Sequence, residues 1–226
     1  DLITIIIIII VTIIVILVAI VLARRAKARI TKNYHLNTID YCKNLPPIVY
    51  TSVVIKPKIS GIYEYSLAKA LLEISLFVTQ SNCLNIVPIL NPPGFTKQNR
   101  LLGIDPSNNK KKMFATIFMN DDNSKFLISF SGTFSLNEWK DDFTYPLVDG
   151  TQLNNYSSGI LVHKGFYEVY LSIQNQIWQL FNQYKDNIKE FYICGHSLGG
   201  ALSTLCAFDF SAHQPIHYSF AAPRSG

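Results

Sequence analysis

The sequence predicts an α/β domain with a mostly parallel sheet flanked by helices, preceded by one transmembrane helix. Two observations predict the domain: short runs of β-branched and aromatic residues alternate with helix-length segments in the C-terminal half, and a Gly-x-Ser-x-Gly sequence joins one such run to a helix. A third observation, an unbroken apolar stretch near the N-terminus, predicts the membrane helix.

Residues 1–23 are predicted to form the transmembrane helix. The segment from Leu2 to Ala23 is apolar except for Thr4 and Thr12, and a helix of about 22 residues is about 33 Å long, enough to cross the hydrocarbon core. A secretory signal peptide begins with basic residues and has a shorter apolar region, whereas this chain begins with Asp1 and its basic cluster follows the apolar run. A buried element of a soluble core rarely runs this long without a charge.

The formal net charge of +5 belongs to the segment after this helix. Between residues 24 and 58 eight Lys and Arg face only Asp40, whereas from residue 59 onward twelve Lys and Arg meet thirteen Asp and Glu. We therefore expect residues 24–60 to be a basic juxtamembrane tether lying against anionic headgroups. Basic residues after a membrane helix place that side in the cytoplasm, so the catalytic domain is expected there. The nearly neutral domain disfavours a nucleic-acid partner.

Residues 61–226 are expected to form the domain. Apolar residues recur at three and four from Ile62 to Gln80, which predicts an amphipathic helix, and the Pro-rich residues 88–112 indicate a long irregular connection. Two runs, Met113–Met119 and Phe126–Ser131, flank a polar turn and predict a hairpin. The elements expected after the hairpin are helices at residues 135–143, 166–184 and 198–212, and strands at residues 191–194 and 216–220.

The segment Cys194-Gly195-His196-Ser197-Leu198-Gly199-Gly200 is the strongest chemical signal. A serine is a nucleophile when it stands clear of its neighbours and a base takes its proton. A Gly-x-Ser-x-Gly turn between a strand and a helix exposes the serine, because glycines let helix and backbone approach without a Cβ clash. Ser197 is therefore the candidate nucleophile. The alternative is a tight strand–helix turn without catalysis.

Four ordered motifs resemble the fungal-type, or class 3, triacylglycerol lipase family of α/β hydrolases. They are Phe130-Ser131-Gly132-Thr133 through Trp139 and Asp142, Val162 to Phe166, Gly195 to Gly200, and Ala222 to Gly226. The resemblance covers roughly residues 62–226 and implies an α/β-hydrolase fold.

The resemblance also implies roles for single residues. Thr133 and the backbone N–H of Leu198 would form the oxyanion hole, and Asp142 would orient the Thr133 hydroxyl. The alternative for Asp142 is a solvated charge at a helix end. Where the family commonly has Arg before the glycine, this chain has Ser131. Residues 134–145 occupy the place of a mobile lid; an ordinary packed surface helix is the alternative.

The acid and base of a triad are not expected within these 226 residues. After Ser197 the only acid is Asp209 and the only histidines are His213 and His217, and none is expected to reach the serine. The resemblance places both groups beyond residue 226, so the chain is expected to be a fragment. His163 and His196 match family positions but are expected to be structural. Cys194 and Cys206 are expected to be buried thiols.

The sequence therefore favours a membrane-anchored serine carboxylic-ester hydrolase, a lipase cleaving glycerolipid acyl esters through an acyl-enzyme. The expected partners are a lipid ester substrate and the membrane, with no metal and no organic cofactor, and the sequence makes no prediction of oligomeric state. Phospholipase A1, diacylglycerol lipase and non-lipid esterase activities remain open. The alternative from another class is a non-catalytic, membrane-tethered module that binds lipid or protein.

Overall fold

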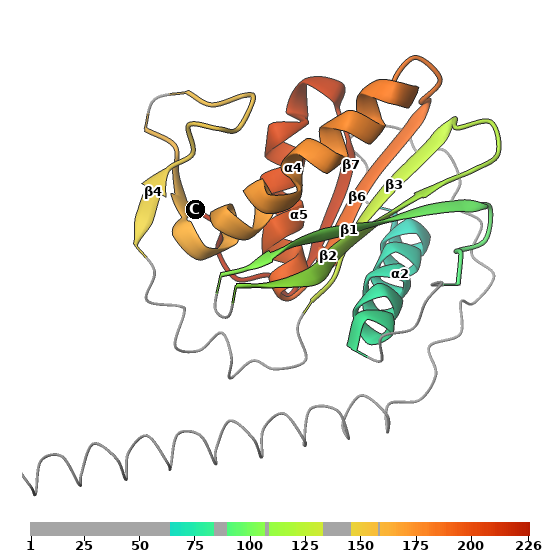
Figure 1. Cartoon of the computed structure of the whole chain (residues 1–226). Coiled ribbons are helices and arrows are strands. Elements are labelled where there is room, and N and C mark those ends of the chain that lie inside the picture. The colour runs from blue at the N-terminus through green and yellow to red at the C-terminus, as the bar shows by residue number, and fades with distance from the viewer. Residues whose placement is uncertain (1–63, 84–89, 107–108, 133–145, 158) are drawn as a thin grey trace, which may run out of the picture. The chain divides into compact units, whose positions relative to one another are not determined.

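The computed structural model describes residues 64–226, apart from residues 84–89, 107–108, 133–145 and 158 (Figure 1). All of the described residues fall in the second of the chain's two units, Pro46–Gly226. The predicted transmembrane helix 1–23, the tether 24–60 and the short helix 135–143 lie outside the described residues. Within the part that is described, no helix combines the length and the hydropathy needed to cross a membrane.

A five-stranded sheet with the order β1-β2-β3-β6-β7 forms the centre of the domain. β1 pairs with β2 and β2 with β3 in antiparallel fashion, whereas β3 pairs with β6 and β6 with β7 in parallel. The prediction of a mostly parallel sheet is therefore wrong: the described sheet is mixed, because short turns link its first three strands. The strands are β1 (Lys97–Asp105), β2 (Lys110–Met119), β3 (Lys125–Phe130), β6 (Glu190–His196) and β7 (Ile216–Phe220).

The hairpin predicted over residues 113–131 is confirmed as β2 and β3. Ala115 pairs with Phe130 and Met119 with Phe126, and the turn between the strands includes Asn123 at a positive φ of 58°. The asparagine side chain tolerates this conformation better than most. The strands predicted at residues 191–194 and 216–220 are confirmed as β6 and β7.

The prediction that residues 88–112 are irregular is wrong for most of its second half, because β1 and the start of β2 lie there. β1 is an edge strand of the described sheet and pairs only with β2. Its first half, Lys97 to Arg100, is polar and stays partly exposed. An edge strand needs no continuous apolar face, so the periodicity that marks a buried strand is missing from its sequence.

Helices cover both faces of the sheet (Figure 1). α2 (Tyr65–Cys83) lies on one face, whereas α4 (Lys164–Tyr184) and α5 (Leu198–Asp209) lie on the other. The helices predicted at residues 62–80 and 166–184 are thereby confirmed with shifted ends. The helix predicted at residues 198–212 ends earlier, at Asp209, and a 3-10 turn, η2 (Ser211–His213), follows it.

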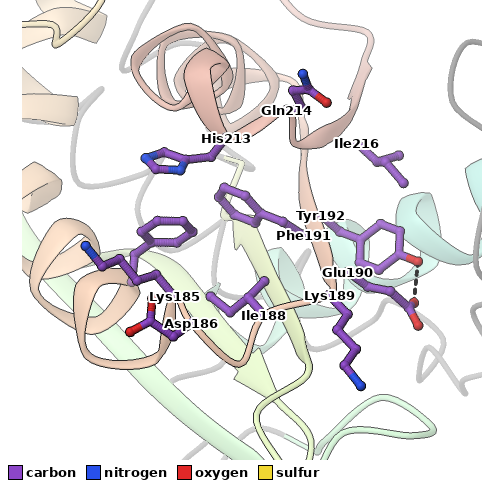
Figure 2. A pocket seen from close by; sticks show the side chains of 11 residues that line it. Lys185, Asp186, Ile188, Lys189, Glu190, Phe191, Tyr192, His213, Gln214 and Ile216 are labelled. Carbon is purple, nitrogen blue, oxygen red and sulfur yellow. Dashed lines mark hydrogen bonds between the residues drawn. The ribbon is translucent and has the colours of Figure 1, made fainter.

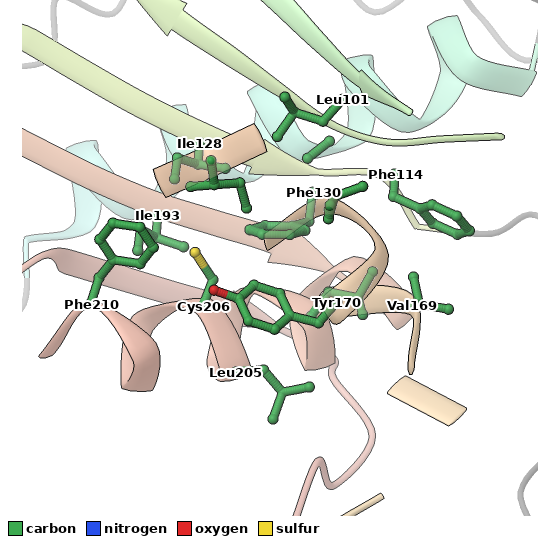
Figure 3. Close-up of a cluster of buried hydrophobic side chains, with 14 of the residues drawn as sticks. Leu101, Phe114, Ile128, Phe130, Val169, Tyr170, Ile193, Leu205, Cys206 and Phe210 are labelled. Atoms are coloured by element: carbon green, nitrogen blue, oxygen red, sulfur yellow. The ribbon is translucent and has the colours of Figure 1, made fainter. Parts of the chain in front are cut away.

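Side chains of the strands point alternately toward the two helical layers, α2 on one face of the sheet and α4 with α5 on the other. In β3, Phe126, Ile128 and Phe130 belong to the core beneath α4 and α5, whereas Leu127 belongs to the core beneath α2. This alternation is the two-residue period of a strand. Figure 3 shows the larger core, where Tyr170 of α4 and Cys206 of α5 lie among aliphatic and aromatic side chains.

A second, two-stranded sheet lies outside the central one. It consists of β4 (Leu147–Asp149) and β5 (Leu161–His163), which pair in antiparallel fashion. The sequence analysis expected no strand between the helices at residues 135–143 and 166–184. Three residues are too few to show a strand periodicity, so these two strands had no recognisable signal.

Candidate active site

Ser197 stands alone in the turn between β6 and α5. Its backbone has φ 56° and ψ −125°, a combination that residues with a Cβ rarely adopt. Such a conformation costs about 1–3 kcal/mol and persists only where the surrounding structure imposes it. Ser197 is the N-cap residue of α5, yet its side chain makes no capping hydrogen bond. Its hydroxyl is therefore not used by the helix.

Glycines around the serine allow the strand, the helix and the neighbouring strand to approach closely. A Cβ on Gly195 would collide with the Gly199 backbone, and one on Gly199 would collide with the carbonyl oxygen of Phe130. A Cβ on Gly200 would lie 2.6 Å from the Cβ of Ala222. These contacts confirm the reason given for the glycines of the motif: without a Cβ, the turn can hold its strained shape.

The backbone of the turn presents donors beside Ser197. Its own N–H donates to the Phe220 carbonyl at 2.9 Å, and its carbonyl accepts from Gly200 N at 2.8 Å. Leu198 is the first residue of α5, and the first N–H groups of a helix have no partner within it. The Leu198 N–H and the positive end of the helix dipole can therefore act on a negative oxygen held next to the serine.

The structure reaches the edge of the predicted oxyanion hole at Gly132. A Cβ on Gly132 would lie 2.7 Å from the carbonyl oxygen of His196, so the chain leaving β3 passes directly against the turn that carries Ser197. Thr133, Asp142 and the predicted lid at residues 134–145 lie outside the described residues.

The two histidines that match family positions are packed into the structure. His163 is the N-cap residue of α4: its Nδ1 accepts from Phe166 N at 3.5 Å, and its ring stacks on Phe166 with centroids 4.2 Å apart. His196, next to Ser197, is half-buried, and this burial lowers its pKa.

Asp209, the only acid after Ser197, is buried at the far end of α5 and engaged there. One carboxylate oxygen accepts from Asn154, from the backbone N at 2.6 Å and from Nδ2 at 2.9 Å. The other accepts from three side chains of α4: Tyr170 Oη at 2.6 Å, Trp178 Nε1 at 2.8 Å and Gln174 Nε2 at 3.1 Å. Asp209 therefore ties α4 and the loop before β5 to α5. Sequence reasoning excluded Asp209 from the triad but missed this role.

The two histidines that follow Ser197 are also engaged elsewhere. His213 packs in the aromatic cluster at the end of α4, with its ring 4.7 Å from that of Phe181. His217 Nε2 lies 3.0 Å from Ser203 Oγ, and because this hydroxyl donates to the Gly200 carbonyl, His217 is the donor. Burial lowers the pKa of His217 to about 4.

Cys194 and Cys206 are buried free thiols, as predicted. Burial raises the pKa of Cys194 to about 11 and that of Cys206 well above its ordinary value. Because the thiolate is the reactive form, neither is suited to act as a nucleophile. Among the described residues, no group of three or more His, Cys, Asp and Glu side chains could hold a metal ion.

Figure 2 shows a pocket of about 480 Å³ beside the residues that lead into β6 and β7. It opens where β6 and β7 begin, whereas Ser197, the candidate nucleophile, follows the last residue of β6. Tyr192 at its wall donates to the Glu190 carboxylate at 2.6 Å. The pocket is therefore separate from the candidate active site. Its lining residues are Phe181, Lys185, Asp186, Ile188, Lys189, Glu190, Phe191, Tyr192, His213, Gln214 and Ile216.

Comparison with known proteins identifies the segment that carries the site. Residues 127–226 match the model of the family described as Lipase (class 3). This segment is similar to class 3 lipases. The match includes all four motifs on which the resemblance was based.

Curated relatives agree with this match. The chain is 35% identical over 128 residues to a lipase of Rhizomucor miehei, covering 50% of this chain and 32% of the relative. It is 30% identical over 129 residues to phospholipase A1-IIgamma of Arabidopsis thaliana, covering 44% of this chain and 31% of the relative. The chain thus spans about a third of the length of these relatives.

Solved structures show the same fold. A deletion mutant of the Rhizomucor miehei lipase propeptide complex superposes with a TM-score of 0.51 at 24% identity, covering 73% of this chain and 54% of that one. The native complex gives a TM-score of 0.50 at 21% identity, covering 81% of this chain and 67% of that one. The domain has the α/β-hydrolase fold of these lipases, with a mixed sheet flanked by helices.

Proposed function

We propose that this chain carries the nucleophile of a serine carboxylic-ester hydrolase acting on glycerolipid acyl esters. The observation that carries the proposal is the strained conformation of Ser197 between β6 and α5, with a hydroxyl that caps nothing. Strain of this kind collects at functional sites, and the strand–turn–helix setting is the one that the Gly-x-Ser-x-Gly motif requires. Similarity to a family described as lipases supports the ester substrate.

In the proposed reaction, Ser197 Oγ attacks the ester carbonyl and an acyl-enzyme forms as the alcohol leaves. The negative charge on the carbonyl oxygen is held by the N–H of Leu198 and by Thr133, with Asp142 orienting the Thr133 hydroxyl. A base must take the serine proton. Asp209, His213 and His217 are each engaged elsewhere. None of the three is therefore proposed as the base or as its acid partner.

The proposal is tested by labelling the full-length protein with a fluorophosphonate probe, which reacts with activated serines. We expect one labelled site in the wild type and none in Ser197→Ala. Ser211→Ala, an exposed serine in η2, is the matched control and should label like the wild type. Labelling that persists in Ser197→Ala, or no labelling of the folded wild type, would refute the assignment.

Phospholipase A1 activity is a second candidate, because two relatives with 30% and 33% identity carry that name. The two activities differ in substrate: triacylglycerol on one side and a phospholipid acyl ester on the other. Release of fatty acid from triolein emulsions and from phosphatidylcholine vesicles, measured side by side on the same preparation, separates them. A non-catalytic binding module would release fatty acid from neither.

We also propose that residues 1–23 anchor the protein as a single membrane helix, with the domain on the cytoplasmic side. The apolar length of this segment and the basic residues 24–58 that follow it support the proposal. The test is extraction of membranes with alkaline carbonate, followed by protease treatment of sealed vesicles. Release of the protein by carbonate would contradict the anchor. In sealed vesicles that have the cytoplasmic face of the membrane inside, protection of the domain from protease would place it on the cytoplasmic side.

A further inference from the structure

Two polar residues near the end of α2 reach the chain that passes beside Ser197. Thr79 is only 3% exposed and lies on the face of α2 that packs on the sheet. Its hydroxyl donates to the Ser75 carbonyl at 2.7 Å and accepts from the backbone N–H of Gly132 at 2.8 Å. A buried N–H without an acceptor is costly. The position of Gly132 therefore depends on this hydroxyl.

Asn82, less than one turn further along α2, holds the residue before Gly132. Its Nδ2 donates to Ser131 Oγ at 2.9 Å and to the Met113 carbonyl at 3.0 Å. The Ser131 hydroxyl in turn donates to the Gly132 carbonyl at 3.0 Å. Ser131 stands where the resembling family commonly has Arg, and here this short hydroxyl is part of a network that fixes both ends of the Gly132 residue.

The same glycine is pressed between α2 and the nucleophile turn. An added Cβ would lie 2.7 Å from the carbonyl oxygen of His196 and 3.4 Å from Thr79 Oγ1. His196 directly precedes Ser197. The Thr79 hydroxyl and the nucleophile turn therefore contact Gly132 together, and a shift at Thr79 is passed on by direct contact.

We propose that Thr79, supported by Asn82, is a positioning residue for the hydrolytic site: it holds the end of β3 in register with the turn of Ser197. Thr79 lies outside residues 127–226, the segment that matches class 3 lipases. The inference rests on the proposed function, in which the residue after Gly132, Thr133, supplies an oxyanion donor. A displaced Gly132 would disturb the turn that carries Ser197, because it lies directly against the carbonyl oxygen of His196.

The kinetic consequence follows from where the network acts. The network touches the backbone that positions the reacting groups, so its loss should lower kcat and leave KM nearly unchanged. Misplacement of a reacting group by about 1 Å can lower a rate about 100-fold. We therefore expect removal of the Thr79 hydroxyl to lower kcat by roughly 10- to 100-fold.

The experiment compares Thr79→Val, which keeps the shape but loses the hydroxyl, with Thr79→Ser, which keeps the hydroxyl. The matched control is Ser75→Ala, which removes another buried hydroxyl of α2, one that donates to the Leu71 carbonyl. In the full-length protein, kcat and KM for p-nitrophenyl butyrate are measured together with the thermal midpoint of unfolding. Thr79→Val should lose kcat while Thr79→Ser recovers most of it, and Ser75→Ala should keep the wild-type kcat even if its midpoint falls.

Equal losses of kcat in Thr79→Val and Ser75→Ala, or a wild-type kcat in Thr79→Val, would overturn the inference, because the hydroxyl would then serve only the stability of the fold. If Thr79→Val does not fold, Asn82→Ala is the second variant, and it must lower kcat at unchanged KM. Failure of the proposed function is distinguished by Ser197→Ala: hydrolysis that survives this change removes the serine mechanism, whatever Thr79 does.

Discussion

Lowering the pH from 7 to 4.5 should destabilise the folded domain by about 2.5 kcal/mol through His217 alone. Burial lowers the pKa of this histidine from 6.5 to about 4, a difference worth about 1.4 kcal/mol per pH unit. The unfolded chain binds a proton at His217 below pH 6.5, whereas the folded chain binds it only near pH 4. The free energy of unfolding is therefore not reduced by His217 above pH 6.5, and it falls as the pH drops through the window from 6.5 to 4.

The His217 contribution is isolated with His217→Gln, which keeps a donor near Ser203 Oγ but does not titrate. Urea unfolding followed by circular dichroism at pH 7, 5.5 and 4.5 gives the free energy of unfolding of both proteins. The wild type should lose about 2.5 kcal/mol more than the variant between pH 7 and pH 4.5, by the linkage relation. An equal pH dependence of wild type and His217→Gln, or an NMR titration of His217 with a midpoint near 6.5, would refute the reasoning.

Three further predictions follow from the packing. Asp209→Asn should lower the free energy of unfolding in a urea titration by about 2–4 kcal/mol, because the new amide nitrogen would face hydrogen-bond donors where a carboxylate oxygen accepts from them in the wild type. In the same titration, Asp186→Asn, at an exposed position, should change the free energy of unfolding by less than about 0.5 kcal/mol. Gly199→Ala should abolish probe labelling and lower the thermal midpoint, since its Cβ would collide with a carbonyl oxygen at the end of β3; a variant that labels at the wild-type rate would contradict this clash. Cys194 and Cys206 should resist Ellman's reagent in the folded protein and react in urea. Fast modification of either of these two residues without denaturant would contradict their burial.

The strained turn at Ser197, the candidate nucleophile, could be predicted from sequence because all of its requirements are local. Gly195, Ser197 and Gly199 stand within five residues, and the strand before them and the helix after them each have a clear apolar pattern. The hairpin of β2 and β3 was equally local. Contact between such neighbours needs no knowledge of the rest of the fold, so the residue pattern was sufficient.

The support of Gly132 and the buried network of Asp209 depend on contacts between residues distant in sequence. Thr79 meets Gly132 across 53 positions, and Asp209 meets Asn154 across 55. A threonine on the buried face of an amphipathic helix carries only a weak signal, because such hydroxyls commonly bond to their own helix, as Thr79 also does. The edge strand β1 escaped prediction for a related reason: its pairing with β2 comes from the sheet, and its first half, Lys97 to Arg100, is polar and partly exposed.

The backbone of Ser197 has a consequence for the way this protein can change. Glycine adopts a positive φ without the penalty that a Cβ brings, so replacing Ser197 by glycine relieves strain at the same time as it removes the nucleophile. A chain with glycine at position 197 would then fold more stably, by up to about 1–3 kcal/mol. Selection for stability alone would drive position 197 toward glycine, so under the proposed function the serine is kept there for its hydroxyl in spite of the strain.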